Sequence, residues 1–441
     1  MRRLAYVVLP VAAALALSWA AVPAFASGTS YTWIGSAFSS GGDNHSWTDP
    51  KNWSPGGVPG TGDSVSVAAP DPSHCTAHVD NIPTASLASL SIVQSPNLCG
   101  VSINGGDVTV TGSFTWNGGD IETPLTIAAG ATGIVSGSNS RLNVIGQPMD
   151  VSGSLTLSAV TGSGASNTGA LRINSPQVLH LLPGGTLSSD GPNDVTFTSC
   201  CLAPAKIVND GTLNVSNGDL TVAAVEVDQN GTLNASNGGR LVSTTAPLTA
   251  RDGASYTGTG GWLVSDGAKA KFTGTQHLDT GFHLELGGLG INAGAAIGGT
   301  ATFAGTGTID WTGGTFEGNT TIGHGVTVQV SGVHTDNGRR VLSGVDALSN
   351  NAVATFTNHG AMNFNNGATV GTGGPAHLVN AADGTITLAP GTHFASGSCC
   401  VNPDQFVNNG KVSVPTSSAT TPAELTNIAY KVGGGGSTSI A

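Results

Sequence analysis

The sequence predicts an all-β protein built as a parallel β-solenoid, in which successive turns of the chain stack on one another. Three observations predict this fold. A long self-similarity runs through the chain, a short strand-like phrase repeats within it, and the composition favours short strands joined by tight turns. Long internal repeats are typical of architectures in which each repeat needs only its neighbours to form a core. We therefore expect one elongated body.

The long self-similarity consists of two blocks. The first recurs 195 residues later, where Gly112, Trp116, Gly118, Gly119, Ile127, Gly130 and Gly137 return as Gly307, Trp311, Gly313, Gly314, Ile322, Gly325 and Gly332. The second recurs 199 residues later, where Ser199, Cys200, Cys201, Pro204, Val208, Asn209 and Gly211 return as Ser398, Cys399, Cys400, Pro403, Val407, Asn408 and Gly410. We expect Trp116 and Trp311 to be packed similarly, beside the paired glycines that follow them.

The short phrase occupies residues 210–218, returns at 230–238, and is repeated more loosely at 382–388 and 408–414. Each copy has a polar residue and a glycine, followed by alternating apolar and small polar residues, which is the pattern of a short strand with one buried face. We expect the glycine to adopt a positive φ at a corner. Rows of Val, Leu and Ile should stack inward, with Asn, Ser and Thr on corners and outer faces.

The composition supports many short strands. Charged residues make up 9% of the chain, hydrophobic residues 39%, and 66 of the 441 residues are glycine. No stretch after the N-terminus keeps the apolar spacing of a helix, and Thr, Val, Ser, Asn and Gly dominate, which suits strands and turns.

Residues 1–26 are predicted to be a signal peptide. Arg2 and Arg3 precede an apolar run that begins at Leu4, and Ala24-Phe25-Ala26 supplies the small residues of a cleavage site. A membrane anchor is the alternative, but prolines and a serine interrupt a span barely long enough to cross.

Removal of the signal peptide leaves 12 basic residues against 26 acidic ones, a net charge near −14. This charge argues against nucleic acid or anionic lipid as a partner. No second long apolar stretch follows, so we expect no transmembrane segment in the mature chain, and a secreted or cell-surface location.

Six cysteines in an exported chain predict disulfides. Cys75 and Cys99 bracket a strand-like stretch and are expected to pair. Cys200-Cys201 and Cys399-Cys400 are expected to form vicinal disulfides, with two free thiols in each pair as the alternative. A metal site needs further ligands nearby, and His393 precedes only the second pair. We therefore expect no metal and no cofactor.

The mature chain opens with Tyr31-Thr32-Trp33-Ile34-Gly35, then Trp47-Thr48-Asp49-Pro50-Lys51-Asn52-Trp53, then Val58-Pro59-Gly60-Thr61-Gly62-Asp63-Ser64-Val65. This run resembles the opening module of large bacterial exported proteins, among them autotransporter-like and adhesin-like surface proteins. The resemblance implies a right-handed parallel β-helix with a small N-terminal capping module, and it implies export. It carries over no catalytic residue.

A cap would cover the apolar end and the unpaired strand edges of the first coil. Trp33, Trp47 and Trp53 are expected to close that end as core residues. The alternative is that these rings form a platform on which sugars stack.

No catalytic residue is predicted. Gly323-His324-Gly325 is similar to a segment of polygalacturonase-like hydrolases, but the accompanying Asp set and Arg-x-Lys are missing in that order, and His324 aligns with Ala129 in the first copy. Polysaccharide lyases need a basic residue and clustered carboxylates. The nearest candidates for such carboxylates are Asp190, Asp194, Glu226 and Asp228, and we expect all four to lie in solvated loops. If Glu226 and Asp228 lie on a strand instead, they point to the same face.

The chain is accordingly divided into a signal peptide (1–26), a cap with the first coils (27–100), a first solenoid half (101–242), connecting coils (243–299) and a second half with the C-terminal end (300–441). The expected function is a non-enzymatic structural or adhesive rod that contacts an extracellular glycan or another cell-surface component. A carbohydrate-active enzyme, either a lyase or a hydrolase, is the alternative. A third possibility is an exported fragment of a longer modular surface protein.

Overall fold

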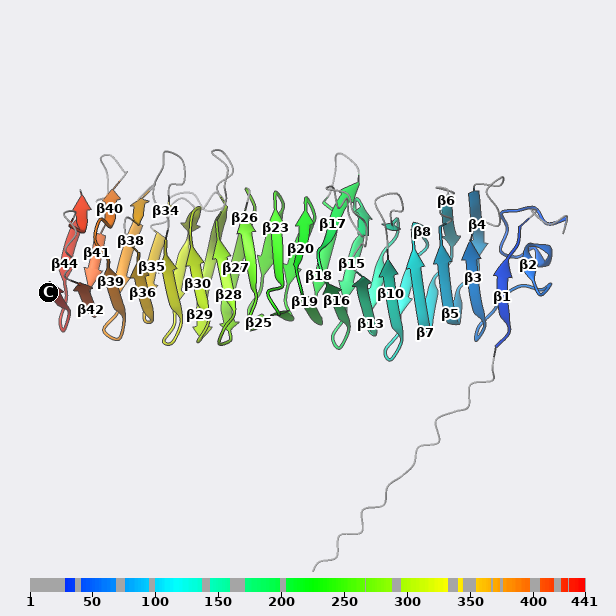
Figure 1. Cartoon of the computed structure of the whole chain (residues 1–441), viewed down its shortest axis with the longest axis horizontal. Coiled ribbons are helices and arrows are strands. Elements are labelled where there is room, and N and C mark those ends of the chain that lie inside the picture. Colours follow the sequence, from blue (N-terminus) through cyan, green and yellow to red (C-terminus); the bar gives the residue numbers. More distant parts are fainter. Residues whose placement is uncertain are drawn as a thin grey trace, which may run out of the picture.

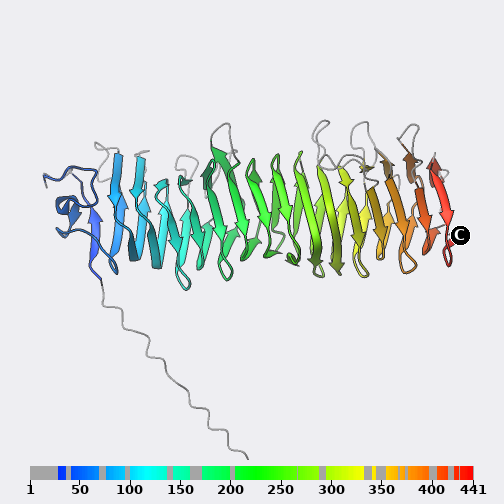
Figure 2. The same ribbon diagram turned by 180° about the vertical axis from the view of Figure 1, so that it is seen from behind.

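The structure is a computed structural model of the chain, and it describes residues 28–35, 41–68, 76–94, 100–136, 143–158, 171–198, 204–265, 267–287, 295–331, 340–343, 354–365, 368–372, 376–396, 405–415, 422–426 and 428–440. Figures 1 and 2 show a rod whose colour passes steadily from blue to red along its long axis, so position along the rod follows position in the sequence. The coils stack through parallel strand pairs, which confirms the predicted parallel β-solenoid.

Each coil has three strand positions, which define three faces. Face 1 is a sheet of 16 strands, to which each coil contributes one strand. Its strands are β4 (Thr76–Ile82), β6 (Gly100–Gly105), β8 (Gly119–Glu122), β11 (Asn143–Ile145), β14 (Leu171–Asn174), β17 (Asn193–Thr198), β20 (Asp219–Ala223), β23 (Arg240–Thr244), β26 (Gly261–Ser265), β28 (His283–Leu286), β30 (Thr308–Trp311), β33 (Thr327–Val330), β36 (Ala361–Phe364), β39 (Thr385–Leu388), β42 (Lys411–Val414) and β45 (Ser437–Ile440).

Faces 2 and 3 belong to one 29-stranded sheet, because four long strands contribute to both faces. These are β5 (Ala85–Val93), β7 (Val108–Asn117), β27 (Lys269–Leu278) and β29 (Ala296–Gly305). The other strands of face 2 are β9 (Leu125–Ile127), β12 (Met149–Val151), β15 (Val178–Leu181), β18 (Lys206–Asn209), β21 (Glu226–Gln229), β24 (Pro247–Ala250), β31 (Thr315–Glu317), β34 (Arg340–Ser343), β37 (Thr369–Thr372), β40 (His393–Ser396) and β43 (Glu424–Thr426). The other strands of face 3 are β10 (Thr132–Ser136), β13 (Ser154–Ser158), β16 (Thr186–Asp190), β19 (Thr212–Ser216), β22 (Thr232–Ser236), β25 (Ser255–Gly258), β32 (Asn319–Ile322), β35 (Ala354–Asn358), β38 (Ala376–Asn380), β41 (Gln405–Asn408) and β44 (Ala429–Val432).

The N-terminal end carries a short irregular unit before the regular coils. Strand β1 (Ser30–Trp33) pairs in parallel with β3 (Ser64–Ala68) and antiparallel with β2 (Trp53–Ser54), which follows the 3-10 helix η1 (Pro50–Asn52). This unit lies at the blue end of the rod in Figure 1.

Inward rows of apolar side chains form the core, as predicted. On face 3 one row runs through Leu155, Leu187, Leu213, Leu233 and Tyr256, each paired with the next in register and each at most 1% exposed. The two copies of the short phrase stack directly, with Thr212 opposite Thr232. Alternating residues of such a strand point inward, so the same apolar positions meet in every coil.

Buried asparagines correct the expectation that Asn lies on corners and outer faces. Asn358, Asn380 and Asn408 are fully buried at the ends of face 3 strands. Asn358 Nδ2 donates to Asn380 Oδ1 at 3.0 Å, and Asn380 Nδ2 donates to Asn408 Oδ1 at 2.9 Å. Each amide also bonds to a backbone carbonyl at the next corner, as Asn380 does to Lys411. A buried amide is tolerated because its polar atoms find partners in the neighbouring coil.

The glycines of the short phrase are required for a different reason from the one predicted. Neither Gly211 nor Gly231 has a positive φ. Instead, a Cβ on Gly231 would lie 2.2 Å from the carbonyl oxygen of Gly211 in the preceding coil. The positive φ falls at the other end of the strand, on Asn217 (58°) and Asn237 (50°), where asparagine tolerates it.

The two copies of the long repeat keep the same indole hydrogen bond at a corner, but they lie on different faces of the rod. The indole N–H of Trp116 donates to the carbonyl of Gly119 at 3.2 Å, and that of Trp311 donates to Gly314 at 3.3 Å. The expected similarity of packing between Trp116 and Trp311 therefore holds for the hydrogen bond that each indole ring makes. However, Trp116 lies on face 3 and Trp311 on face 1.

The second block of the self-similarity is displaced in the same sense. Val208 lies on face 2 and Val407 on face 3. Both blocks are thus shifted by one face around the rod, and matched residues do not stack in one column.

Replacement of Gly231 by alanine should lower the midpoint of thermal unfolding, because the new methyl group would overlap the carbonyl oxygen of Gly211, at a cost of about 1–3 kcal/mol. Gly100→Ala is the matched control, since nothing lies within 4 Å of its Cβ position. Melting followed by circular dichroism compares the two variants. Equal midpoints would contradict the close approach of the coils at Gly231.

Replacement of Asn380 by alanine should destabilise the C-terminal coils by about 2–4 kcal/mol, because it removes hydrogen bonds to buried amides in the preceding and following coils. Asn363→Ala on the outer side of face 1 is the control, with an expected change within about 0.5 kcal/mol. Urea unfolding measures both. A loss no greater than that of the control would show that the buried amide chain contributes little.

Candidate ligand-binding surfaces

The three tryptophans of the N-terminal unit are core residues, as expected. Trp33, Trp47 and Trp53 are 2%, 1% and 1% exposed. Their rings pack edge to face, with the Trp47 and Trp53 centroids 4.8 Å apart. The Trp47 indole N–H donates to Pro59 and that of Trp53 to Trp47, so these two rings are fixed from within. Buried rings cannot serve as a platform for sugars, and the alternative interpretation is wrong.

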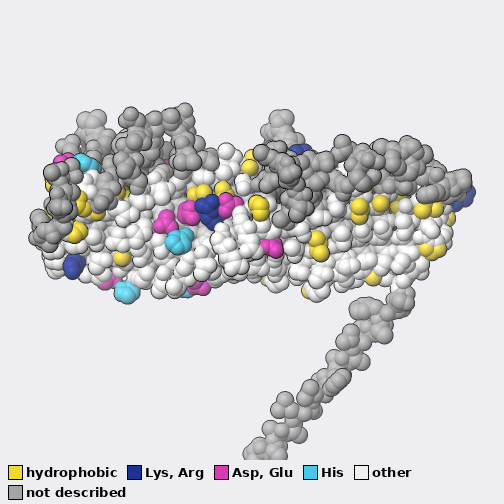
Figure 3. All heavy atoms as spheres, in the orientation of Figure 1, with side chains coloured by type: hydrophobic (Ala, Val, Ile, Leu, Met, Phe, Trp, Pro, Cys, Tyr) yellow, Lys and Arg dark blue, Asp and Glu magenta, His cyan; other side chains and the backbone are white. Residues whose placement is uncertain are grey.

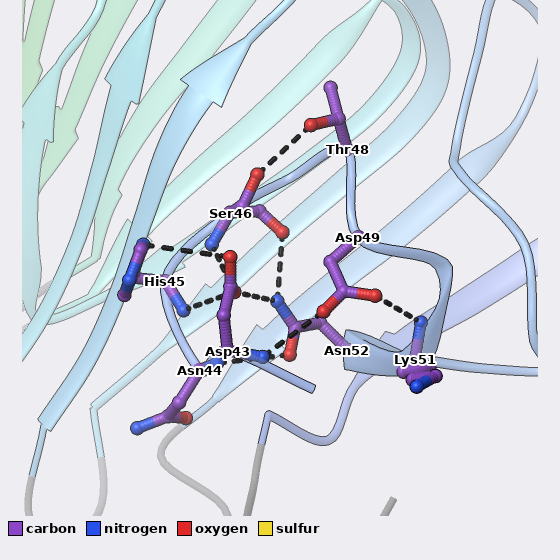
Figure 4. A network of polar contacts seen from close by, with 8 residues as sticks. All are labelled: Asp43, Asn44, His45, Ser46, Thr48, Asp49, Lys51 and Asn52. Atoms are coloured by element: carbon purple, nitrogen blue, oxygen red, sulfur yellow. Dashed lines mark hydrogen bonds and ion pairs between the residues drawn. The ribbon is translucent and has the colours of Figure 1, made fainter. Parts of the chain in front are cut away.

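A polar network holds the loop around these rings (Figure 4). Asp43 Oδ1 accepts hydrogen bonds from the backbone N–H groups of His45 and Ser46 and from Asn52 Nδ2, at 3.0, 2.8 and 2.7 Å. Asn52, which is fully buried, also donates to the carbonyl of Ser46 at 2.8 Å. Burial by itself raises the pKa of Asp43, but these donors stabilise the charged form more and lower its pKa from 3.8 to about 2.

The predicted carboxylate candidates are placed as follows. Asp190 is exposed at the end of β16, where it accepts a hydrogen bond from Asn217 Nδ2 at 2.7 Å. Asp194 lies in strand β17, so its placement in a solvated loop is wrong. His324 is exposed at a corner, as expected for a surface histidine.

Glu226 and Asp228 lie on strand β21, so their placement in a solvated loop is wrong, and they share one face as predicted for a strand. Both contact the ammonium group of Lys206, at 3.3 and 3.4 Å. Asp228 Oδ2 also accepts from Arg251 at 2.7 Å, and the Asp228 side chain is only 4% exposed. A carboxylate this deeply buried requires such paired cations. The cluster therefore joins neighbouring coils.

Histidine–carboxylate contacts also join successive coils. His180 Nε2 lies 2.7 Å from Asp210, His283 Nδ1 lies 2.5 Å from Asp310, and further along His359 Nδ1 lies 2.8 Å from Asp383. The hydrogen bond from His180 lowers the pKa of Asp210.

An ion-pair ladder crosses the middle of face 1. Arg240 binds Asp219 in the preceding coil through Nε and Nη2, at 3.0 and 2.9 Å. Its Nη1 reaches Glu285 at 3.4 Å, two coils further along, since Gly261 lies between them without a side chain. Figure 3 shows acidic, basic and histidine side chains gathered near the middle of the rod. Sequence spacing did not reveal this ladder, because its members are separated by whole coils.

Face 2 is hollowed beside this region. A hollow of about 300 Å³, here called the basic groove, is lined by Pro247, Leu248, Thr249, Lys269, Ala270, Lys271, Ala296, Gly298, Gly299 and Glu317. Lys269 and Lys271 alternate outward on β27 and are exposed. The sequence analysis missed these residues. The signal was present as two lysines two positions apart in a chain that has few basic residues.

The remaining expectations concern the cysteines, the signal peptide, metal sites and membrane-spanning segments. Cys75, Cys99, Cys200, Cys201, Cys399 and Cys400 all lie outside the ranges given above, so the predicted disulfides remain predictions. The signal peptide lies outside them too. Among the described residues, no group of three or more His, Cys, Asp or Glu side chains could hold a metal ion. Within the same ranges, no helix has the length and apolar character needed to cross a membrane.

Comparison with known proteins adds little. No protein-family model and no curated protein matches the sequence. One solved structure, described as the crystal structure of the TibC-catalyzed hyper-glycosylated TibA55-350 fragment, is similar at 15% identity with a TM-score of 0.30, over 76% of this chain and 96% of that chain. A likeness this weak supports no argument about function.

The Asp43 network makes the N-terminal unit sensitive to acid. The folded-state pKa is lowered from 3.8 to about 2, so this stabilisation is complete above pH 4 and is lost as the pH falls toward 2. Its size is about 1 kcal/mol, because Asp43 is partly exposed and screened by solvent. Tryptophan fluorescence during acid titration should report loosening of the unit.

Asp43→Asn is the matched variant for that titration. It should weaken the network at neutral pH and remove most of the fluorescence change between pH 4 and 2. An unchanged titration in this variant would show that another group causes the transition.

Proposed function

We propose that this protein is a secreted or cell-surface structural and adhesive rod, non-enzymatic, whose long faces contact an extracellular glycan. The observation that carries the proposal is a regular array of small polar side chains on a rigid surface. A stacked solenoid presents the same type of group in coil after coil. Weak contacts repeated along such a surface can add up to useful avidity.

The array lies on the C-terminal part of face 1. One outward column runs through Gln329, Asn363, Thr387, Ser413 and Ser439, paired coil to coil in register. These side chains are partly or fully exposed. Hydroxyl and amide groups can both donate and accept hydrogen bonds, as sugar hydroxyls do. The strands that carry the first four of these residues pair with a strand on each side, and Ser and Thr lose little side-chain entropy on binding.

The export and surface location rest on the signal-peptide prediction and on the resemblance of the opening module. The proposed division at residues 100, 242 and 299 likewise stays a prediction.

A carbohydrate-active enzyme is the second candidate, because the basic groove brings together Lys269, Lys271 and Glu317 on a lateral surface. Catalysis by a carboxylate pair needs a second acid nearby. Burial and the neighbouring charge of Glu122 raise the pKa of Asp120, as in a catalytic acid, but Asp120 lies on β8 of face 1, many coils from the groove. The groove and this carboxyl group do not converge, which favours the rod.

Binding of the mature protein to an immobilised glycan panel tests the proposal. We expect weak binding in solution, with a clear gain when the protein is displayed at high density. The triple variant Gln329→Ala, Asn363→Ala, Thr387→Ala should lower binding by about tenfold, because it removes three adjacent hydrogen-bonding groups.

The matched control is Ser91→Ala, Thr115→Ala, Thr156→Ala, which removes outward hydroxyls from face 3. Equal loss in both variants, or no binding to any glycan, would contradict the assignment of face 1. New reducing ends or unsaturated uronates that disappear in Glu317→Gln would favour the enzyme.

A further inference from the structure

We infer that the basic groove on face 2 binds an acidic saccharide, an inference that rests on the proposed glycan-contacting function and gives it a ligand class. The argument has three parts: the charge of the groove, its shape, and its position on the rod.

The charge is local and opposite to that of the protein. The mature chain carries a net charge near −14, yet Lys269 and Lys271 project side by side from one strand. Within the described part of the chain, neither ammonium group has a carboxylate within 4.0 Å. By contrast, Lys206 and Arg240 each contact two carboxylates, and Arg251 contacts one. Two exposed ammonium groups without a protein partner form a site for an anionic group.

The shape comes from missing side chains. Thr249 and Lys271 are register partners on β24 and β27, and Lys271 pairs with Gly298 on β29. Because Gly298 has no side chain, the surface is open between Lys271 and Glu317. A Cβ added there would lie 3.6 Å from Cβ of Glu317, an ordinary contact, so the backbone does not require glycine at this position.

The arrangement suits a saccharide better than a small free anion. Pro247, the exposed register partner of Lys269 on β24, gives a flat apolar surface against which a sugar ring can lie. Thr249 offers a hydroxyl group that can donate to and accept from sugar hydroxyls. The four strands that form the groove span about 14 Å along the rod, given a spacing of about 4.8 Å between strands. That length accommodates more than one sugar residue.

The groove therefore orients its ligand. An acidic group is held at the lysine end, where the ammonium groups of Lys269 and Lys271 project from one strand. Neutral sugars lack the charged contact, so they should bind to this groove weakly.

Binding of the full mature chain to polygalacturonate, dextran sulfate and neutral dextran tests the inference. The wild type should bind at least one of the two acidic polymers, with affinity falling as salt is raised, and the two arms separate carboxylates from sulfate esters. Lys269→Ser, Lys271→Ser should reduce this binding by about tenfold or more. Lys51→Ser, Lys431→Ser, which removes two exposed lysines away from the groove, is the charge-matched control and should leave binding unchanged.

Two further variants test the shape. Gly298→Val adds a side chain to the hollow while both lysines are kept, and it should also abolish binding. Glu317→Gln should increase affinity for the acidic polymer, because it removes a negative charge from the lining of the groove. Circular dichroism confirms that each variant is folded. Equal losses in the Lys51 and Lys431 control, an unaltered affinity in Gly298→Val, or equally tight binding of a single-stranded DNA oligonucleotide would overturn the inference.

The failure of this inference is distinguishable from failure of the proposed function. If the wild type binds neutral glycans through face 1 and no acidic polymer, the groove assignment is wrong and the adhesive function stands. If it binds no glycan of either kind, both are wrong.

Discussion

The structure depends on the register with which each coil lies on the one before it. Parallel strands on three faces exchange backbone hydrogen bonds with both neighbouring coils, so a shift of one residue would turn every apolar side chain of a coil outward. Two devices hold this register. Inward rows such as Leu187, Leu213 and Leu233 stack apolar surface, and buried amides such as Asn380 bond to the coils on either side. The amides lie beside glycine corners, since a Cβ on Gly384 or Gly410 would meet the side chain of Asn380.

The sequence was a good guide to features with local periodicity. Alternation of apolar and polar residues predicted the strands, and the repeat at residues 210–218 and 230–238 predicted the stacking of β19 on β22. The sequence did not show why particular residues occupy their positions. Gly231 is small because another backbone lies against it, and Asn358 is polar although buried because its partner is Asn380. Both reasons lie in the neighbouring coil, which local pattern does not reveal. The long repeat is displaced by one face for a related reason, because the same corner motif can form at any of the three corners of a coil.

The surface features were harder to foresee, because they combine residues from several coils. Arg240 reaches Glu285 across the bare strand position of Gly261, and the basic groove exists because Gly298 leaves space between Lys271 and Glu317. In each case a glycine in one coil determines what the side chains of its neighbours can reach. A solenoid with few charges thus concentrates them into ladders and one groove.

Disulfide cross-linking between engineered cysteines tests the register most directly. Asn214 and Asn234 are register partners whose side chains lie 3.1 Å apart, so a pair of cysteines at these positions should oxidise readily. A pair at positions 214 and 236, displaced by two residues on the same face, has Cα atoms about 8 Å apart and should not cross-link without backbone movement. Peptide mapping by mass spectrometry distinguishes the new bonds from those of the native cysteines. Cross-linking of the 214 and 234 pair alone is the predicted result. Equal cross-linking of both pairs, or preference for the displaced one, would contradict the stacked coils.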